Sequence, residues 1–251
     1  MKELENKVAI ITGAGSGIGK AAALLFARNG AKLVLTDINE DHLLEAVGEV
    51  KALGAEAIGV TADSSKAEDN KEITDIALDV YGRLDIAVNN AGIGGAIAPV
   101  GEYDIEEWQK VININLSGVF YGMRYQIPAI EKTAGRGSII NVASILGSVG
   151  FANSAAYVAA KHGVVGLTKT AALEYSAKGI RVNSVGPGFI KTPLVQRALP
   201  QEALDGLVAL HPIGRLGEAA EVAEVFLFLA GDRSSFVTGS YYTVDGGYTS
   251  L

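Results

Sequence analysis

The chain has 251 residues, of which 49% are hydrophobic and 20% are charged, and its formal net charge is −7. This length and composition allow one domain with a large core and exclude a disordered or collagen-like chain. The acidic balance opposes binding to the phosphates of nucleic acid or to an anionic membrane surface, so we expect neither partner.

The sequence contains no cysteine, which excludes disulfides, thiolate metal sites and a thiol nucleophile. Its first residues, MKELENKVAIITGAG, are charged and have only a short apolar run before the glycines, unlike a signal peptide. No stretch approaches the roughly 20 apolar residues that span a bilayer. We therefore expect a cytoplasmic protein.

Short β-branched segments alternate with longer helical patterns along the chain. A strand at VAIIT precedes a helix to Asn29, and a strand at KLVLTD precedes a helix through Leu53. Further strands are predicted at AIGVTAD, LDIAVNN, GSIINVAS and IRVNSVGP. The alternation predicts parallel strands with right-handed crossovers, and the nearly all-apolar strands predict helices on both faces. The expected fold is a single α/β domain over residues 1–251, a Rossmann-like doubly wound parallel β-sheet.

The first strand leads into a glycine-rich turn, Thr12 to Gly19, which opens a helix near Lys20. Glycines let a backbone approach a pyrophosphate, and a helix N-terminus supplies free N–H groups and partial positive charge. Glycines also serve ordinary tight turns. The strand before this turn, and the acidic Asp37 about 20 residues further on, favour a dinucleotide site.

Asp37, at the end of the second strand, also bears on the choice of cofactor. A carboxylate there accepts hydrogen bonds from a free ribose diol and repels the 2′-phosphate of NADP, and the nearby Ser16 and Ile38 are uncharged. We therefore predict NAD. A turn or helix-capping role for Asp37 before Asn39 stays open. Asp63, at the end of the third predicted strand, could likewise contact adenine or cap a helix expected to start near Ser64.

A tyrosine and a lysine lie four residues apart in a helix predicted from about Ala155 to Ser176. Tyr157 and Lys161 therefore share one helix face. A phenol pKa of about 10 is too high for an efficient base at neutral pH, but a nearby ammonium and a positively charged nicotinamide favour the phenolate. A half-buried ring beside a solvated charge is the common alternative for such a pair.

Together with Ser144, these motifs resemble the short-chain dehydrogenase/reductase family over essentially the whole chain. The resemblance depends on the TGAGSGIG turn, on NNAG after the fourth strand, on Asn115 in NINLSGVF, and on Ser144 thirteen residues before Tyr157. It continues through PGFIKTP and the closing TVDGG.

The resemblance implies that Tyr157 exchanges a proton with the substrate oxygen and that Ser144 hydrogen-bonds the same oxygen. It implies that Lys161 holds the nicotinamide ribose and that Asn115 anchors a water-linked proton path, while Asn113 is expected to be structural. The implied cofactor site consists of Gly13, Ser16, Gly17, Ile18, Gly19, Asp37, Ile38, Ala62, Asp63, Asn90, Ala91, Gly92, Tyr157, Lys161, Pro187, Gly188, Ile190 and Thr192.

The expected reaction is hydride transfer between NAD(H) and a secondary alcohol or ketone. In oxidation, Tyr157 takes the hydroxyl proton as the hydride passes to nicotinamide, and Ser144 steadies the developing carbonyl. No catalytic metal is expected, because the histidines, His42, His162 and His211, are scattered along the sequence.

The least regular stretch, about 188–215, is predicted to be a substrate-binding loop or lid, with a functionless surface insertion as the alternative. The expected pocket segments, 94–100, 145–152 and 194–210, are mostly apolar or small. They favour a hydrophobic or cyclic substrate over a sugar or an acid.

Two other functions fit parts of the sequence. The pattern also resembles 3-oxoacyl thioester reductases, but these typically use NADPH, which Asp37 opposes. A non-catalytic dinucleotide-binding sensor would be free to lose Tyr157, Lys161 or Ser144, and all three are present. The family resemblance further implies a homotetramer, formed through the helices that carry Asn115 and Tyr157 and through the C-terminal strand, with a monomer as the alternative.

Overall fold

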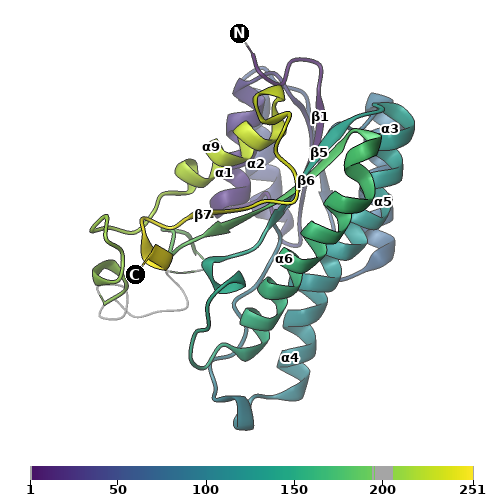
Figure 1. Ribbon diagram of the computed structural model, residues 1–251. Coiled ribbons are helices and arrows are strands. Elements are labelled where there is room, and N and C mark those ends of the chain that lie inside the picture. The colour runs from purple at the N-terminus through teal and green to yellow at the C-terminus, as the bar shows by residue number, and fades with distance from the viewer. Residues whose placement is uncertain (1, 194, 196–205, 251) are drawn as a thin grey trace.

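The computed structural model describes residues 2–193, 195 and 206–250 (Figure 1). Within these residues, seven parallel strands form one sheet in the order β3-β2-β1-β4-β5-β6-β7. The strands are β1 (Val8–Thr12), β2 (Lys32–Asp37), β3 (Ala57–Thr61), β4 (Ile86–Asn89), β5 (Gly137–Val142), β6 (Ile180–Pro187) and β7 (Tyr241–Val244).

Helices cover both faces of the sheet, as Figure 1 shows. On one face lie α1 (Gly17–Arg28), α2 (Glu40–Ala52) and α9 (Ala219–Ala230). On the other lie α3 (Ala67–Tyr81), α5 (Gly118–Thr133) and α6 (Ala155–Tyr175), and α4 (Ile105–Ile112) packs against α6. This arrangement confirms the predicted doubly wound α/β fold. No helix in the described part of the chain has the length and apolar character needed to cross a membrane.

The strands form at runs of consecutive apolar residues, whose side chains point alternately to the two faces of the sheet. In β1, Ala9 and Ile11 pack into the core with α1, while Val8 and Ile10 pack into the core with α3 and α5. Such double burial requires an unbroken apolar run. The predicted uniform character does not extend to β3, where only Ala57 is buried and the following residues alternate between partly buried and exposed, because this strand is at the edge of the sheet.

Two helices begin at residues other than those expected. The α1 helix starts at Gly17 and not near Lys20, because the last glycines of the turn form the first helical turn. The α3 helix starts at Ala67, since a turn closed by Asp63 precedes it: the Asp63 carboxylate accepts hydrogen bonds from the backbone and hydroxyl of Ser65. Asp63 therefore closes this turn and does not cap the helix.

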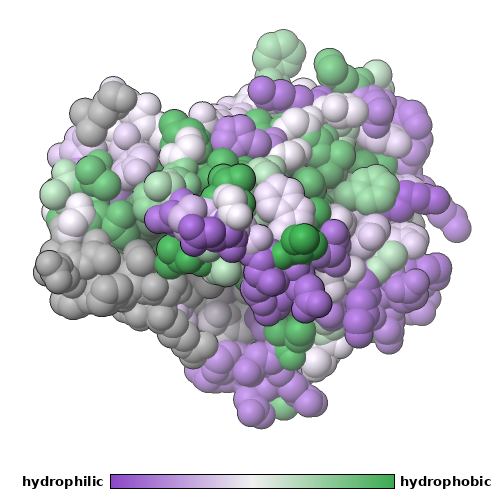
Figure 2. All heavy atoms as spheres, turned by 90° about the horizontal axis from the view of Figure 1, so that it is seen from below, coloured by the Kyte–Doolittle hydropathy of each residue, from purple (hydrophilic) through white to green (hydrophobic). Residues whose placement is uncertain are grey.

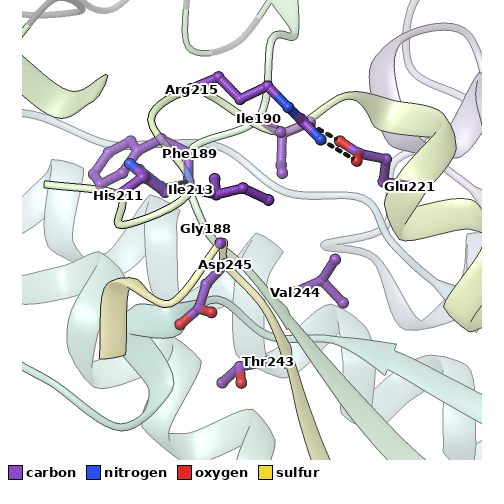
Figure 3. Close-up of a pocket in the computed structure, with 12 residues that line it drawn as sticks. Gly188, Phe189, Ile190, His211, Ile213, Arg215, Glu221, Thr243, Val244 and Asp245 are labelled. Atoms are coloured by element: carbon purple, nitrogen blue, oxygen red, sulfur yellow. Dashed lines mark hydrogen bonds and ion pairs between the residues drawn. The ribbon is translucent and has the colours of Figure 1, made fainter. Parts of the chain in front are cut away.

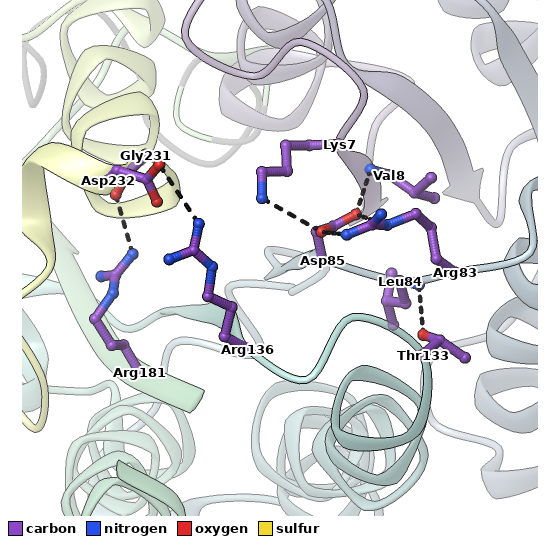
Figure 4. A network of polar contacts seen from close by, with 10 residues as sticks. All are labelled: Lys7, Val8, Arg83, Leu84, Asp85, Thr133, Arg136, Arg181, Gly231 and Asp232. Carbon is purple, nitrogen blue, oxygen red and sulfur yellow. Dashed lines mark hydrogen bonds and ion pairs between the residues drawn. The ribbon is translucent and has the colours of Figure 1, made fainter. Parts of the chain in front are cut away.

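The amino ends of the strands are held together by a polar network (Figure 4). The Asp85 carboxylate, almost fully buried, accepts hydrogen bonds from the backbone N–H of Val8 and from the Arg83 guanidinium, and it also pairs with Lys7. This network lies opposite the carboxyl ends, where the strand order reverses between β1 and β4. In such sheets, the crevice at the reversal point is the usual ligand site.

Candidate active site

The glycine-rich turn after β1 and the turn after β4 form one rigid unit. The side-chain amide of Asn90 donates hydrogen bonds to the carbonyls of Thr12 and Gly13, at 2.9 and 3.2 Å. The Thr12 hydroxyl accepts from the backbone N–H groups of Asn90 and Ala91, both at 3.0 Å. Gly13 has a φ of +63°, and a Cβ on Gly19 would collide with the Gly13 carbonyl, so both positions require glycine.

The N-terminus of α1 opens beside this turn. Ser16 precedes the helix without a capping side-chain hydrogen bond, and the first helical turn carries no acidic residue. The first N–H groups of a helix have no partner within the helix and lie at the positive end of its dipole. This cradle therefore fits the pyrophosphate of a dinucleotide.

Asp37 lies at the same turn. One of its carboxylate oxygens accepts a hydrogen bond from the Gly15 N–H and the other from the Asn39 N–H, each at 2.9 Å. Asn39, and not Asp37, caps α2, because its side chain accepts from the His42 N–H. The Asp37 carboxylate therefore stabilises turns, which is the alternative role that the sequence left open. It lies at the end of β2, where a ribose hydroxyl of a dinucleotide would need an acceptor. Ile38, the next residue, is exposed.

A cleft at the carboxyl ends of the strands brings ten predicted site residues together: Ile18, Asn90, Gly92, Ser144, Tyr157, Lys161, Pro187, Gly188, Ile190 and Thr192. The other predicted residues are not among those that line it: Gly13, Ser16, Gly17, Gly19, Asp37, Ile38, Ala62, Asp63, Ala91 and Asn115. Two lining residues were missed, Val142 and Ala143, whereas Val195 belongs to the predicted pocket segment 194–210. Val142 and Ala143 directly precede Ser144, and this adjacency was the signal that could have identified them.

Lys161 is the most deeply buried charged group of the cleft, with 3% of its surface exposed. Its ammonium donates a hydrogen bond to the Val142 carbonyl at 2.8 Å and lies 5.5 Å from the centre of the Tyr157 ring. Burial lowers the pKa of Lys161 from 10.5 to about 8. The ammonium is therefore held close to the phenol in surroundings that penalise its charge.

The pKa of Tyr157 is raised above its ordinary value of 10. Burial is the largest cause, a side-chain hydrogen bond with Ser144 acts in the opposite direction, and the neighbouring Tyr241 adds to the increase. The direction differs from the lowering expected from Lys161, because burial of the phenol outweighs the groups that favour the phenolate. Ser144 and Tyr157 both line the cleft, so their side chains face the same space.

Asn115 lies behind this cleft, in a π-helical segment, Asn113–Ser117, between α4 and α5. It is fully buried, and its amide makes two hydrogen bonds of 2.8 Å with the backbone of Ile93. A Cβ on Gly92 would lie 3.1 Å from the Asn115 amide oxygen and 3.7 Å from the Lys161 ammonium, so the two side chains flank this glycine. Asn113 instead accepts a hydrogen bond from Gln109 at the surface.

The predicted lid, 188–215, is described at its two ends; residue 194 and residues 196–205 lie outside the described residues. At the first end, Thr192 is buried and its methyl group lies over Gly17, where a Cβ would be 3.2 Å away. The Gly188 N–H donates to the Val244 carbonyl at 2.9 Å. The start of the segment is therefore fixed both to the glycine turn and to the last strand.

A second pocket, drawn in Figure 3, lies on the other side of the Gly188–Ile190 backbone and shares these two residues with the cleft. His211 is buried in its wall, with one ring nitrogen 2.7 Å from the Leu207 carbonyl and the other 3.4 Å from the Phe189 N–H. Seen from below in Figure 2, the face that carries these loops has apolar side chains interspersed among polar ones.

The histidines have no common site. His42 is partly buried in α2, His162 is exposed and bonds the Val158 carbonyl within its own helix, and His211 is in the wall of the second pocket. Over residues 2–193, 195 and 206–250, no three His, Asp or Glu side chains are grouped as a metal site would require.

The chain is similar to known proteins over nearly its whole length. A family model described as enoyl-(acyl carrier protein) reductase matches residues 13–249. The chain is 53% identical over 248 residues to cyclohexanol dehydrogenase from Acinetobacter sp. (strain SE19), covering 99% of this chain and 97% of the relative. It is 43% identical over 244 residues to the 3-oxoacyl-(acyl-carrier-protein) reductase FabG of Thermotoga maritima, covering 97% and 98%.

A solved structure shows the same architecture. The crystal structure of levodione reductase matches the fold with a TM-score of 0.96 and 36% sequence identity, covering 99% of both chains. The family model and both relatives extend over nearly the whole sequence, including all the motifs that line the cleft. The chain therefore belongs to the short-chain dehydrogenase/reductase family and is an oxidoreductase.

Proposed function

We propose that the protein interconverts hydrophobic or cyclic secondary alcohols and their ketones, with NAD(H) as the hydride carrier. The observation that carries this proposal is the convergence of Ser144, Tyr157 and Lys161 on one cleft beside the glycine turn. The 53% identity to a protein named cyclohexanol dehydrogenase supports a cyclic substrate. The similarity to levodione reductase supports a carbonyl substrate.

The chain's own residues would hold the dinucleotide and move the proton. The glycine turn and the N-terminus of α1 hold the pyrophosphate, Asp37 the adenosine ribose, and the Lys161 ammonium the nicotinamide ribose. When bound, the nicotinamide supplies the hydride acceptor for oxidation and the hydride donor for reduction.

In the oxidation direction, the deprotonated oxygen of Tyr157 accepts the substrate hydroxyl proton. As the proton leaves, the carbinol C–H bond would break, and its hydrogen and both bonding electrons would be taken up by the hydride acceptor that a bound nicotinamide supplies. The Ser144 hydroxyl donates a hydrogen bond to the substrate oxygen as this oxygen becomes a carbonyl. Asn115, which flanks Gly92 opposite Lys161, anchors the path by which the Tyr157 proton reaches solvent.

The choice of NAD over NADP depends on the charge at Asp37. Both carboxylate oxygens accept backbone hydrogen bonds, which fix the orientation of the carboxylate at the proposed ribose position. Neighbouring Ser16 and Ile38 carry no positive charge to receive a 2′-phosphate. An NADP(H) cofactor would therefore meet uncompensated repulsion at this turn.

A second candidate is reduction of 3-oxoacyl thioesters, which the 43% identity to FabG favours. The apolar character of the pocket segments supports the alcohol reaction instead, and so does the higher identity to the cyclohexanol enzyme.

A homotetramer is part of the proposal: α5 and α6 enclose an open apolar groove lined by Leu116, Phe120, Tyr121 and Leu167, which a second copy would cover. The expected cytoplasmic location stays a prediction.

The test measures absorbance at 340 nm with cyclohexanol, cyclohexanone, open-chain secondary alcohols and a 3-oxoacyl thioester, using NAD(H) and NADP(H) in parallel. We expect the highest kcat/KM for a cyclic substrate with NAD(H). Faster turnover of the thioester would favour the second candidate, and preference for NADPH would contradict the role given to Asp37. Binding of NADH with no turnover of any substrate would favour a sensor.

A further inference from the structure

Tyr241, on the last strand of the sheet, contacts the backbone of the active-site Ser144. Tyr241 begins β7 and pairs with Ser184 of β6, and its side chain packs into the core on the α6 side of the sheet. The ring lies across Gly186, where an added Cβ would collide with the phenol oxygen and lie 2.5 Å from a ring carbon. Glycine at position 186 therefore leaves the space that the ring occupies.

The hydroxyl of Tyr241 donates a hydrogen bond to the backbone carbonyl of Ser144 at 2.5 Å. The same carbonyl accepts from the Gly147 N–H at 2.8 Å, which closes the 3-10 turn Ile145–Gly147. The Tyr241 phenol thus holds the carbonyl on which the turn closes.

This turn fixes the direction of the Ser144 hydroxyl. The Ser144 backbone is extended, and its side-chain oxygen accepts a 3.2 Å hydrogen bond from the Leu146 N–H within the turn. A rotation of the Ser144–Ile145 peptide would turn the Ser144 carbonyl away from the Gly147 N–H and open the turn that holds the Leu146 N–H beside the Ser144 hydroxyl. The Tyr241 hydrogen bond opposes this rotation because it holds the carbonyl of the same peptide.

We propose that Tyr241 is a positioning residue that acts through Ser144, setting the place of the Ser144 hydroxyl relative to Tyr157 and hence the rate of the chemical step. The inference rests on the proposed function, in which Ser144 hydrogen-bonds the reacting oxygen. Tyr241 is not among the residues that line the cleft in the described part of the chain, so the proposed effect passes through Ser144. Burial raises the pKa of Tyr241, which keeps its hydroxyl protonated and donating at neutral pH.

The test compares Tyr241→Phe, which keeps the ring and removes the hydroxyl, with Tyr242→Phe. Tyr242 is the next residue of β7 and packs into the core on the opposite side of the sheet. We expect Tyr241→Phe to lower kcat about tenfold with KM values within about twofold, the effect of losing one strong hydrogen bond from a preorganised group. Tyr242→Phe should retain the wild-type kcat.

A double-mutant cycle with Ser144→Ala separates positioning from general destabilisation. If Tyr241 acts through Ser144, adding Tyr241→Phe to Ser144→Ala should cost less than about twofold. An equal loss in both backgrounds, or an unchanged kcat in Tyr241→Phe alone, overturns the proposal. Gly186→Ala, which displaces the phenol without removing it, is a second variant and should show the same dependence on Ser144.

These ratios are measured with any substrate that the wild type turns over, including a 3-oxoacyl thioester. Failure of the cyclic alcohols would therefore count against the proposed substrate class alone. Failure of the coupling between positions 241 and 144 would count against the positioning role alone.

Discussion

The Lys161 ammonium donates a hydrogen bond of 2.8 Å to the backbone carbonyl of Val142, the last residue of β5. This bond joins the helix that carries Tyr157 to the strand that leads into Ser144. It also keeps a positive charge in a site that is almost closed to water, where the pKa of Lys161 falls from 10.5 to about 8.

The lowered pKa predicts how stability depends on pH. An unfolded chain keeps the Lys161 proton to about pH 10.4, whereas the folded chain keeps it only to about pH 8. Between these values the unfolded state binds more protons, so the contribution of Lys161 to stability rises with pH; below pH 8 its buried charge is destabilising. Relative to wild type, Lys161→Met should be more stable at pH 7 than at pH 10, by up to about 3 kcal/mol.

Chemical denaturation at the two pH values measures this difference. Lys169→Met is the matched control, because Lys169 is exposed on the same helix. A difference between Lys161→Met and wild type that stays constant with pH would show that burial does not perturb the lysine.

Tyr157→Phe should lower kcat by about 10²- to 10⁴-fold, the usual contribution of a general acid–base group. The raised pKa of Tyr157 further predicts that alcohol oxidation, which needs the phenolate, speeds up as pH rises, while ketone reduction, which needs the phenol, slows down. Steady-state pH profiles in both directions test this. NADH binding measured by fluorescence should be retained, and Tyr175→Phe, at the far end of α6, should behave as wild type.

Asp37→Asn removes the charge beside the ribose position and keeps an oxygen to accept one backbone hydrogen bond. We expect the preference for NAD⁺ over NADP⁺, measured as a ratio of kcat/KM values, to fall about tenfold, because the repulsion of a 2′-phosphate is lost. Asp41→Asn, an exposed carboxylate in the first turn of α2, should leave the ratio unchanged. An unaltered ratio in Asp37→Asn would mean that other groups select the cofactor.

Asp85→Ala should destabilise the fold by about 3 kcal/mol, because it leaves the Val8 N–H and the Arg83 guanidinium without their buried acceptor. Removing the exposed Asp75, which pairs with Lys71 on the surface of α3, should cost no more than about 1 kcal/mol. Denaturation midpoints give the comparison. The kcat of folded Asp85→Ala should equal that of wild type, and a lower value would mean that the amino ends affect the site.

The strands were predictable because the apolar residues that each strand buries follow one another in its sequence. In β5, Ile139 packs into one core and Ile140 into the other, so the apolar run is continuous. The start of α1 was placed too late because glycine, a poor helix former, occupies its first turn. The start of α3 was missed because Asp63 closes a separate turn first.

For the site, the sequence predicted which residue types meet but not how they are held. Tyr157 and Lys161 share a helix face, so their proximity follows from local spacing. The contact between Tyr241 and Ser144 joins positions 97 residues apart, and no local pattern reveals it. The upward shift of the Tyr157 pKa was also not predictable, since it depends on how much water the folded cleft excludes.

The ion-pair network around Asp85 and the cleft around Tyr157 lie at opposite ends of the same parallel strands. Substitutions at the amino ends can therefore raise or lower the melting temperature without approaching the reacting atoms. A more thermostable enzyme could therefore be sought by redesigning the residues around Lys7 and Arg83, without changing the turnover rate. The loops at the carboxyl ends would remain free for changing which ketone the protein accepts.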